Sequence, residues 1–522
     1  MELPEAVTSV IDAGLELIYS FEPLAAKTVV LGAFSLESKR YCHPRSFSLS
    51  SITVPGFVSG YVESLSEAIG FDVETLNYTL GLFLCYPLAM IMNLIPYGKM
   101  RHLFSFLLGA FLMQFTLGVQ WVHQLITSLV VYAMFLVLPR KLNTTLVPTF
   151  AMLYLVFGHL HRQYINYLGW DLDFTGAQMV LTQKVYMMAF NLYDGEVLAK
   201  GKDSKAAKKC EAFALKQLPD IFEFLGYTFL FSNVLSGPAY EFSTYKAACE
   251  GSHIVGPDGK PKGKLPSNVW PSLRPFLVCL LNLVVFVVVG AQFPLLDPVD
   301  PQKNTPVILT EEFLKQPWVQ RFFYLWMGLL VVRQKYYFAW KCSEGANNVW
   351  YAGFDGFDAD GKPKGWSNSD NVNIVGFELA PNIQTLSKEW NKKTSLWLTR
   401  YVYIRTNGSL LAVYSMSAFW HGFYPGYYLF FMSVPLYTVC ERLGRKKISP
   451  YFSDAKFSLY GILCIVVSSV FVEYIVSAFA MLSLDRAWGN YKANYFFGHV
   501  GAILFYVVAS MLPSPKKKDK KA

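Results

Sequence analysis

The sequence predicts an all-α, polytopic membrane protein built as a bundle of transmembrane helices, and two observations support this fold class. The 522 residues are 53% hydrophobic and 16% aromatic but only 16% charged, whereas soluble domains carry about 25% charged residues. Apolar runs long enough to cross a bilayer, which takes roughly 20 residues, recur between residues 77 and 512. Because these runs are spread evenly, one helical membrane domain is favoured over several soluble domains.

The spans can be placed in order along the chain. Residues 1–60 form an N-terminal segment with an amphipathic, interfacial stretch at 6–19 and a weak span within 21–60. With these early segments the total is roughly 11 crossings. Residues 61–512 are therefore expected to form one transmembrane domain. The clear candidates are 77–97, 102–118, 121–138, 144–160, 221–240, 275–296, 322–340, 411–439, 459–482 and 494–512.

Two further stretches, 173–195 and 380–405, are amphipathic and too polar to face lipid. Segments of this kind lie inside a bundle or line a wet cavity.

The last residues, 513–522, form a basic tail that the positive-inside rule places in the cytosol. Lys518 and Lys520 stand fifth and third from the end, a spacing that resembles a retrieval signal of the endoplasmic reticulum. A simple stop-transfer charge cluster is the alternative. The tail predicts a multi-pass protein of the endoplasmic reticulum membrane with a cytosolic C-terminus.

The distribution of charge and of cysteines bears on whether the protein binds nucleic acid or a metal. Much of the net charge of +9 lies in the short stretches 200–209, 442–447 and 516–521, which orient a membrane protein and attract anionic headgroups. We therefore expect no nucleic-acid partner. The eight cysteines are scattered without Cys-x-x-Cys or zinc spacing, so we predict free thiols and no metal. A homo-oligomer is compatible with the sequence, which leaves the oligomeric state open.

The run 411–439 contains no Lys, Arg, Asp or Glu, and His421 is its one residue that titrates near neutral pH. An imidazole in hydrocarbon is costly, so we expect it to face a cavity or a polar partner. Pro425 is predicted to kink the helix just past His421, while Gly422 and Gly426 allow a close approach of backbone or ligand. The alternative is a core histidine with satisfied hydrogen bonds.

A second group of polar and aromatic residues precedes this run by about thirty positions. Residues 388–405 mix aromatic side chains with basic ones, and Asn391 directly follows Trp390. Considered alone, this stretch is an amphipathic helix and Asn391 is a capping or surface amide.

Together the two stretches resemble the membrane-bound O-acyltransferase family. The pattern Trp-Asn-x-x-Thr-x-x-Trp-Leu from Trp390, followed by Ser-Ala-x-Trp-His-Gly-x-x-Pro-Gly-Tyr around His421, is similar to its lysophospholipid acyltransferase branch, with the strongest likeness to lysophosphatidylcholine acyltransferases. The middle block 157–195, the Gly237-Pro238 motif, the run 340–346 and the run from Asn371 to Glu378 fit the same branch in order.

The resemblance implies a bundle that encloses an internal reaction chamber, acyl-CoA as co-substrate and no tightly bound cofactor. It implies that His421 is the general base and that Asn391 either polarises the thioester or orients a reacting group. It also implies transfer to the sn-2 hydroxyl of lysophosphatidylcholine, with the ethanolamine and serine lysolipids as further candidates, in phospholipid remodelling. Substrate-binding candidates are Trp390, Trp420, Lys392, Lys393, Arg400, Arg405, Gly237 and Pro238.

One departure leaves headgroup and acyl-chain preference open. Ala239-Tyr240-Glu241 follows Gly237-Pro238, where bulkier aromatics and often an Arg are expected from the resemblance. Two other functions compete with the lipid acyltransferase: a protein O-acyltransferase of the same superfamily and a membrane transporter with His421 in its path. The chain lacks the paired halves typical of many transporters.

Overall fold

A computed structural model describes residues 56–69, 72–169, 172–296, 305–452 and 457–513. These residues form helices joined by turns and loops, and no strand occurs among them, which confirms the all-α prediction. The predicted interfacial helix at 6–19, all but the last five residues of the stretch 21–60 with its weak span, and the Lys-rich tail lie outside the described residues. The proposed division at residues 60 and 512 stays a prediction.

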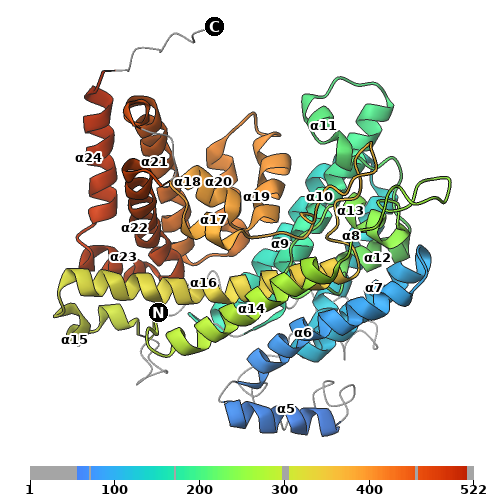
Figure 1. Cartoon of the computed structure of the whole chain (residues 1–522), viewed down its shortest axis with the longest axis horizontal. Helices are drawn as coiled ribbons and strands as arrows, with labels where there is room; N and C mark the ends of the chain where they lie inside the picture. The colour runs from blue at the N-terminus through green and yellow to red at the C-terminus, as the bar shows by residue number, and fades with distance from the viewer. Residues whose placement is uncertain (1–55, 70–71, 170–171, 297–304, 453–456, 514–522) are drawn as a thin grey trace, which may run out of the picture. The chain divides into compact units, whose positions relative to one another are not determined.

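The chain divides into two compact units, which are described separately (Figure 1). The first consists of Met1–Ser272 and Gly345–Ser369, and the second of Leu273–Glu344 and Asp370–Ala522. The described helices of the first unit are α5 (Gly56–Ile69), α6 (Val73–Leu94), α7 (Lys99–Leu117), η1 (Gly118–Gln120), α8 (Trp121–Val137), α9 (Arg140–Ile165), α10 (Phe174–Ala199), α11 (Lys205–Lys209), η2 (Glu211–Phe213), α12 (Ile221–Thr228) and α13 (Phe242–Glu250).

Helix α10 is the centre of the first unit. It covers the predicted amphipathic stretch 173–195, packs along α9 and α8, and is buried over most of its length. Its Lys184 is fully buried and donates from Nζ to the carbonyl oxygen of Tyr227 at 2.8 Å. A buried amino group must be hydrogen-bonded, so α10 can be polar and still lie inside the first unit, which is one of the two placements that the sequence predicted.

The second unit contains most of α14 and α16 and all the later helices. Its elements are α14 (Val269–Gly290), η3 (Val307–Leu309), α15 (Glu311–Leu314), α16 (Trp318–Val349), α17 (Ile374–Glu378), α18 (Ile383–Glu389), α19 (Lys392–Leu398), the π-helical turn η4 (Thr399–Tyr403), α20 (Leu410–His421), α21 (Pro425–Lys447), η5 (Ser449–Tyr451), α22 (Leu459–Met481), α23 (Leu484–Ala493) and α24 (Phe497–Met511).

A buried ion network joins three helices of this unit. Arg333 of α16 donates to Glu473 of α22 and, at 3.0 and 3.1 Å, to both carboxylate oxygens of Glu378 at the end of α17. Truncating one member of a buried pair leaves an uncompensated charge. The network therefore fixes α17, the helix that leads toward Asn391, against α16.

Several predicted spans match helices in length and apolar character. Four stretches among the described residues could cross a membrane by these two criteria: Val73–Leu94, Lys99–Val137, Val269–Gly290 and Leu459–Met481. A fifth is formed if α23 and α24, which meet at 66°, count as one bent span. The total of roughly 11 crossings stays a prediction.

Two predicted spans are not continuous helices. In the stretch 221–240, α12 ends at Thr228 and turns follow. In the stretch 411–439, the expected kink at Pro425 is wrong, because α20 ends at His421 and Pro425 instead begins α21. Proline is favoured in the first turn of a helix, where no backbone donor is lost, so Pro425 starts a new helix.

Candidate active site

Asn391 lies at the junction of α18 and α19 in a left-handed backbone conformation, with φ +42° and ψ +52°. Asparagine is one of the few side chains that adopts this region readily. Although Asn391 occupies the N-cap position of α19, its side chain makes no capping hydrogen bond. Its Oδ1 instead accepts from Asn371 Nδ2 at 3.2 Å. The alternative of a capping amide is therefore wrong.

Asn371 also holds the backbone that follows Asn391. The Lys392 N–H donates to the Asn371 carbonyl oxygen at 2.9 Å, and the Lys393 N–H donates to Asn371 Oδ1 at 3.0 Å. Two residues on, the Asn373 N–H donates to the carbonyl oxygen of Glu389 at 3.0 Å. Residues 371–373 thus run beside residues 389–393 and hold them by hydrogen bonds.

Trp390 packs among the aromatic side chains of α16 and α17. Its ring centroid lies 5.0 Å from that of Trp340 and 4.9 Å from that of Phe377. The rings of Tyr336 and Tyr337 complete this cluster at 5.7 Å each. Such ring pairs add about 0.5–1.5 kcal/mol beyond area burial, so Trp390 anchors the residue before Asn391.

Lys392 pairs with two carboxylates. Its Nζ lies 2.6 Å from Asp370 Oδ2 and 3.3 Å from Glu389 Oε2. Burial alone would lower the pKa of Lys392, but the hydrogen bond to Asp370 and the charges of Asp370 and Glu389 outweigh it and raise the pKa. The ammonium is therefore charged at neutral pH and already neutralised by protein groups.

The two predicted binding arginines lie further along the same stretch. Arg400 belongs to the π-helical turn η4, and π-helical turns occur frequently at functional sites. Arg405 follows η4, and its guanidinium carbon lies 5.4 Å from the centroid of the Tyr401 ring. Both side chains are half-buried.

His421 is the last residue of α20 and is surrounded by aromatic rings. The ring of Phe431 stacks on the imidazole with a centroid distance of 5.4 Å, and that of Phe479 meets it edge-on at 5.0 Å. Tyr427 lies at 5.8 Å and Trp420 at 4.7 Å. The imidazole is partly exposed, and these rings pack around it on several sides.

The chain reverses between α20 and α21 through two glycines with different roles. Gly422 has φ +120°, a conformation that favours glycine. Gly426 donates from its N–H to the Leu482 carbonyl oxygen at 2.7 Å, and a Cβ on it would lie 2.1 Å from the Ala478 carbonyl oxygen. The sequence predicted that a backbone or a ligand comes close at Gly426, and the structure shows that it is the backbone of α22 and of Leu482 after it.

The helices that carry the two candidate catalytic residues touch through tryptophans. Trp397 of α19 is fully buried, and its ring centroid lies 6.0 Å from that of Trp420 in α20. Trp397 follows Asn391 by six residues, whereas Trp420 immediately precedes His421. This contact connects the two segments within one compact unit.

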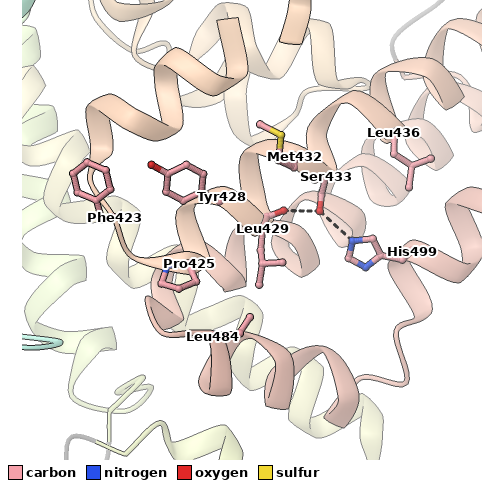
Figure 2. A pocket seen from close by; sticks show the side chains of 9 residues that line it. All are labelled: Phe423, Pro425, Tyr428, Leu429, Met432, Ser433, Leu436, Leu484 and His499. Atoms are coloured by element: carbon pink, nitrogen blue, oxygen red, sulfur yellow. Dashed lines mark hydrogen bonds between the residues drawn. The ribbon is translucent and has the colours of Figure 1, made fainter. Parts of the chain in front are cut away.

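The second unit has an apolar groove of about 620 Å³, and the first of its lining residues in chain order is Phe423, two positions after His421. Figure 2 shows Phe423 and Pro425 at one end and Leu436 and His499 toward the other. Two of its polar side chains are bonded to the protein: Ser433 Oγ donates to the Leu429 carbonyl oxygen at 2.7 Å and lies 3.0 Å from His499 Nε2. The wall that faces the groove is therefore mostly hydrocarbon.

Gly237 and Pro238 belong to the first unit and are buried there. The Gly237 N–H donates to the Asn233 carbonyl oxygen at 2.7 Å, and Asn233 Nδ2 donates to the Pro238 carbonyl oxygen at 2.6 Å. Next to this motif the Tyr240 hydroxyl lies 2.6 Å from Ser369 Oγ. These hydrogen bonds within the first unit fix the conformation of the turn. A contact of Gly237 and Pro238 with substrate stays a prediction.

A family comparison agrees with this geometry. Residues 116–484, which include Gly237, Asn391 and His421, match the model of the membrane-bound O-acyltransferase family. The chain belongs to this family. It is therefore an acyltransferase and a multi-pass membrane protein, as the sequence predicted.

The relatives of this membrane-bound O-acyltransferase cover most of its length. It is 29% identical over 477 residues to "Membrane-bound glycerophospholipid O-acyltransferase 2" of Rattus norvegicus, which is 88% of this chain and 89% of the relative. It is 29% identical over 489 residues to "Membrane-bound glycerophospholipid O-acyltransferase 1" of Homo sapiens, covering 90% and 95%. The "Lysophospholipid acyltransferase" of Schizosaccharomyces pombe is 27% identical over 480 residues, covering 88% and 90%.

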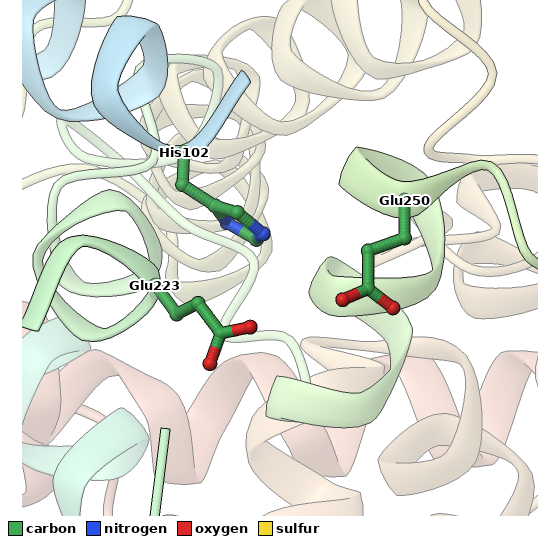
Figure 3. Close-up of side chains that lie close together, drawn as sticks. All are labelled: His102, Glu223 and Glu250. Atoms are coloured by element: carbon green, nitrogen blue, oxygen red, sulfur yellow. The ribbon is translucent and has the colours of Figure 1, made fainter. Parts of the chain in front are cut away.

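The first unit of this O-acyltransferase contains a group that resembles a metal site. The ligand atoms of His102, Glu223 and Glu250 all lie within 4.8 Å of one another (Figure 3). However, Lys246 Nζ lies 2.7 Å from Glu223 Oε1 and 3.5 Å from Glu250 Oε1. Burial alone would lower the pKa of Lys246, but its hydrogen bond to Glu223 and the two carboxylates raise it. The protein thus supplies its own cation here, and the absence of a metal stays a prediction.

Sequence reasoning missed the residues that support the two candidate catalytic groups. Asn371 was part of a matching run but received no role, and Phe431 and Phe479 were not considered. A signal existed for Asn371, because it begins the run 371–378 that resembles the family. No local pattern links Phe479 to His421, since they are 58 positions apart.

Proposed function

We propose that this acyltransferase transfers an acyl group from acyl-CoA to the free hydroxyl of a lysophospholipid, with His421 as the general base. The observation that carries the proposal is the position of His421. It lies at the interrupted end of a helix, among aromatic rings, and its segment is joined by Trp420 to the helix that follows Asn391. A histidine at a break between apolar helices can meet an amphipathic substrate while remaining partly shielded from water.

The reaction needs no covalent enzyme intermediate. His421 takes the proton of the lysolipid hydroxyl as its oxygen attacks the thioester carbonyl carbon, a task that suits an imidazole because its ordinary pKa lies near neutral pH. The carbonyl oxygen gains negative charge, and Asn391 stabilises it or orients the reactants. The carbon–sulfur bond then breaks, and the coenzyme A thiolate receives the proton that His421 holds.

The acceptor is proposed from the relatives and the lining of the second unit. The relatives are named glycerophospholipid and lysophospholipid acyltransferases, and the apolar groove lined by Phe423 and Pro425, which follow His421 closely in the chain, offers a hydrocarbon surface for an acyl chain. We propose the sn-2 hydroxyl of lysophosphatidylcholine as the main acceptor. Lysophosphatidylethanolamine and lysophosphatidylserine are the further candidates, and the setting is phospholipid remodelling.

The acyl-CoA end of the site is proposed to use basic and aromatic side chains of the second unit. Arg400 and Arg405 are the preferred partners for the coenzyme A phosphates, since a guanidinium binds phosphate in a bidentate manner. Lys392 and Lys393 are weaker candidates, because Lys392 already pairs with Asp370 and Glu389. The remaining proposed substrate contacts are Trp390, Trp420, Gly237 and Pro238.

The cellular setting follows from the tail. We propose the endoplasmic reticulum membrane with a cytosolic C-terminus, which would place the basic tail on the side where acyl-CoA is made available.

A protein O-acyltransferase would require a polypeptide acceptor, and the relatives' names favour a lipid acceptor. A transporter is no longer needed to explain His421 in an apolar stretch.

Purified protein, labelled acyl-CoA and a panel of lysolipids test the proposal. Transfer is expected, with the highest kcat/KM on lysophosphatidylcholine. His421→Ala is expected to reduce transfer by about 10²–10⁴-fold and Asn391→Ala by about 10²–10³-fold, both without loss of the thermal unfolding transition. Normal transfer by folded His421→Ala protein, or transfer to a peptide and to no lysolipid, would contradict the proposal.

A further inference from the structure

We propose that Asn371 is a positioning residue that fixes the carboxamide of Asn391 so that Asn391 Nδ2 is presented as a hydrogen-bond donor to the reacting thioester. This inference rests on the proposed function and deepens it, because it chooses between the two roles that the sequence left open for Asn391. It follows from the directions of three hydrogen bonds.

The first step is the orientation of Asn371 itself. Its Oδ1 lies 3.0 Å from the Lys393 backbone nitrogen, and a backbone N–H can only donate. The atom of Asn371 at that place must therefore be its oxygen, since its NH₂ group has no acceptor lone pair. This bond fixes which end of the Asn371 carboxamide is Nδ2.

The second step transfers this orientation to Asn391. Asn371 Nδ2 is a donor and lies 3.2 Å from the Asn391 side chain, so the Asn391 atom that faces it must be the acceptor, Oδ1. The Asn391 Nδ2 group consequently points away from Asn371. Within the described part of the chain, no hydrogen bond to another residue uses Asn391 Nδ2.

The third step is rigidity. Asn371 is 2% exposed, and its carbonyl oxygen also accepts the Lys392 N–H at 2.9 Å. Asn391 is held in the left-handed region by the residues on both sides of it. A donor that is fixed before the reaction begins needs no reorganisation as charge develops on the carbonyl oxygen, which is why such donors have large effects on rate.

The Asn371→Asp variant tests this directly. The introduced carboxylate can still accept the Lys393 N–H, but it has no N–H to give to Asn391 Oδ1. The Asn391 carboxamide must then rotate and donate from Nδ2 to the carboxylate, which removes the donor from the reacting centre. We expect kcat to fall by about 10²–10³-fold, with the KM for acyl-CoA changed by less than about twofold.

Asn373→Asp is the matched control. Asn373 is exposed, lies two residues away, and uses its side-chain oxygen to accept the Gly376 N–H at the start of α17. Aspartate caps a helix as well as asparagine does. The same change of chemistry at this position should leave kcat at the wild-type value.

Asn391→Asp provides a second test if Asn371→Asp does not fold. Its carboxylate still accepts from Asn371 Nδ2 but has no donor, so we expect a normal unfolding transition and a similar loss of kcat. Wild-type kcat in either folded variant overturns the inference, as does a loss that appears only in KM. If Asn391→Ala and His421→Ala abolish transfer while Asn371→Asp keeps it, the inference fails and the proposed function stands. If wild-type protein transfers no acyl group, the proposed function itself fails.

Discussion

The surroundings of Asn391 and of His421 differ in the forces that hold them. Asn391 is held by directional hydrogen bonds: Asn371 donates to its side chain and accepts from the two backbone N–H groups that follow it. His421 lies among the rings of Phe431 and Phe479, next to a close backbone contact at Gly426. The geometry around Asn391 is a set of directional hydrogen bonds, whereas that around His421 includes a set of ring contacts.

This difference suits the two proposed tasks. A donor to a developing oxyanion must be aimed before the reaction, and hydrogen bonds of defined direction aim it. A base must accept a proton and release it again, so its nitrogen should meet the substrate, and the rings of Phe431 and Phe479 set the orientation of the imidazole plane. The two regions should therefore respond to different kinds of substitution.

The largest effect is expected from Gly426→Ala, which disturbs the packing of the helices around His421. The new Cβ would lie 2.1 Å from the Ala478 carbonyl oxygen and 2.8 Å from that of Leu482. Both atoms are backbone, so α21 and α22 must separate, and overpacking of this kind costs about 1–3 kcal/mol or more. We expect a clear drop in the thermal midpoint in detergent and loss of most transfer activity.

Gly444→Ala is its matched control on the same helix. There the nearest atom to a new Cβ is Cζ of Phe505 at 3.3 Å, the far end of a side chain that can move. We expect a small change in the thermal midpoint. Ala favours a helix more than Gly does, so equal destabilisation by the two substitutions would show that the close approach of α21 to α22 at Gly426 is not the cause.

An intermediate effect is expected from Phe479→Ala, which removes the ring that meets the imidazole edge-on at 5.0 Å. A misplacement of about 1 Å at a reacting group can cost about 10²-fold in rate, so we expect kcat to fall by about 10–100-fold. Steady-state kinetics on folded protein measure this.

Phe471→Ala is the control, since Phe471 lies on the same helix and packs against Tyr437 and Phe497 instead of His421. Phe479 contacts four rings and Phe471 two, so kcat is compared at a temperature below the unfolding transition of both variants. If Phe471→Ala lowers kcat as much as Phe479→Ala does, the ring packing around His421 has no special role.

The sequence predicted the helical membrane fold and the identity of both candidate residues because these depend on local patterns. Hydropathy over about 20 residues identifies apolar helices, and the residues around Asn391 and His421 form a recognisable motif. The family match over residues 116–484 confirms the family, while the roles of Asn391 and His421 stay predictions.

What the sequence could not predict depends on contacts between distant residues. A proline after a histidine is compatible with a kink or with the start of a new helix. In the structure a new helix begins at Pro425, where Gly426 packs closely against the backbone of Ala478 and Leu482. The orientation of Asn391 depends on Asn371, twenty positions earlier. Hydrogen-bond direction cannot be inferred from spacing alone.

The smallest effect is expected from Lys392→Ala, which removes a charge beside Asn391 but leaves the Asn371 bonds in place. The Lys392 side chain is 23% exposed and those of Asp370 and Glu389 are 26% and 20% exposed, and ion pairs near solvent contribute about 0–1 kcal/mol. Because its pKa is raised in the fold, this stabilisation is complete below the ordinary lysine pKa and is lost only as pH rises through the higher value. Between pH 6 and 9 the difference in thermal midpoint from wild type should therefore be small and constant.

The KM for acyl-CoA should rise less in Lys392→Ala than in Arg400→Ala or Arg405→Ala. If Lys392→Ala raises it most, coenzyme A competes successfully with Asp370 and Glu389, and the polar region around Asn391 binds substrate as well as positioning the amide.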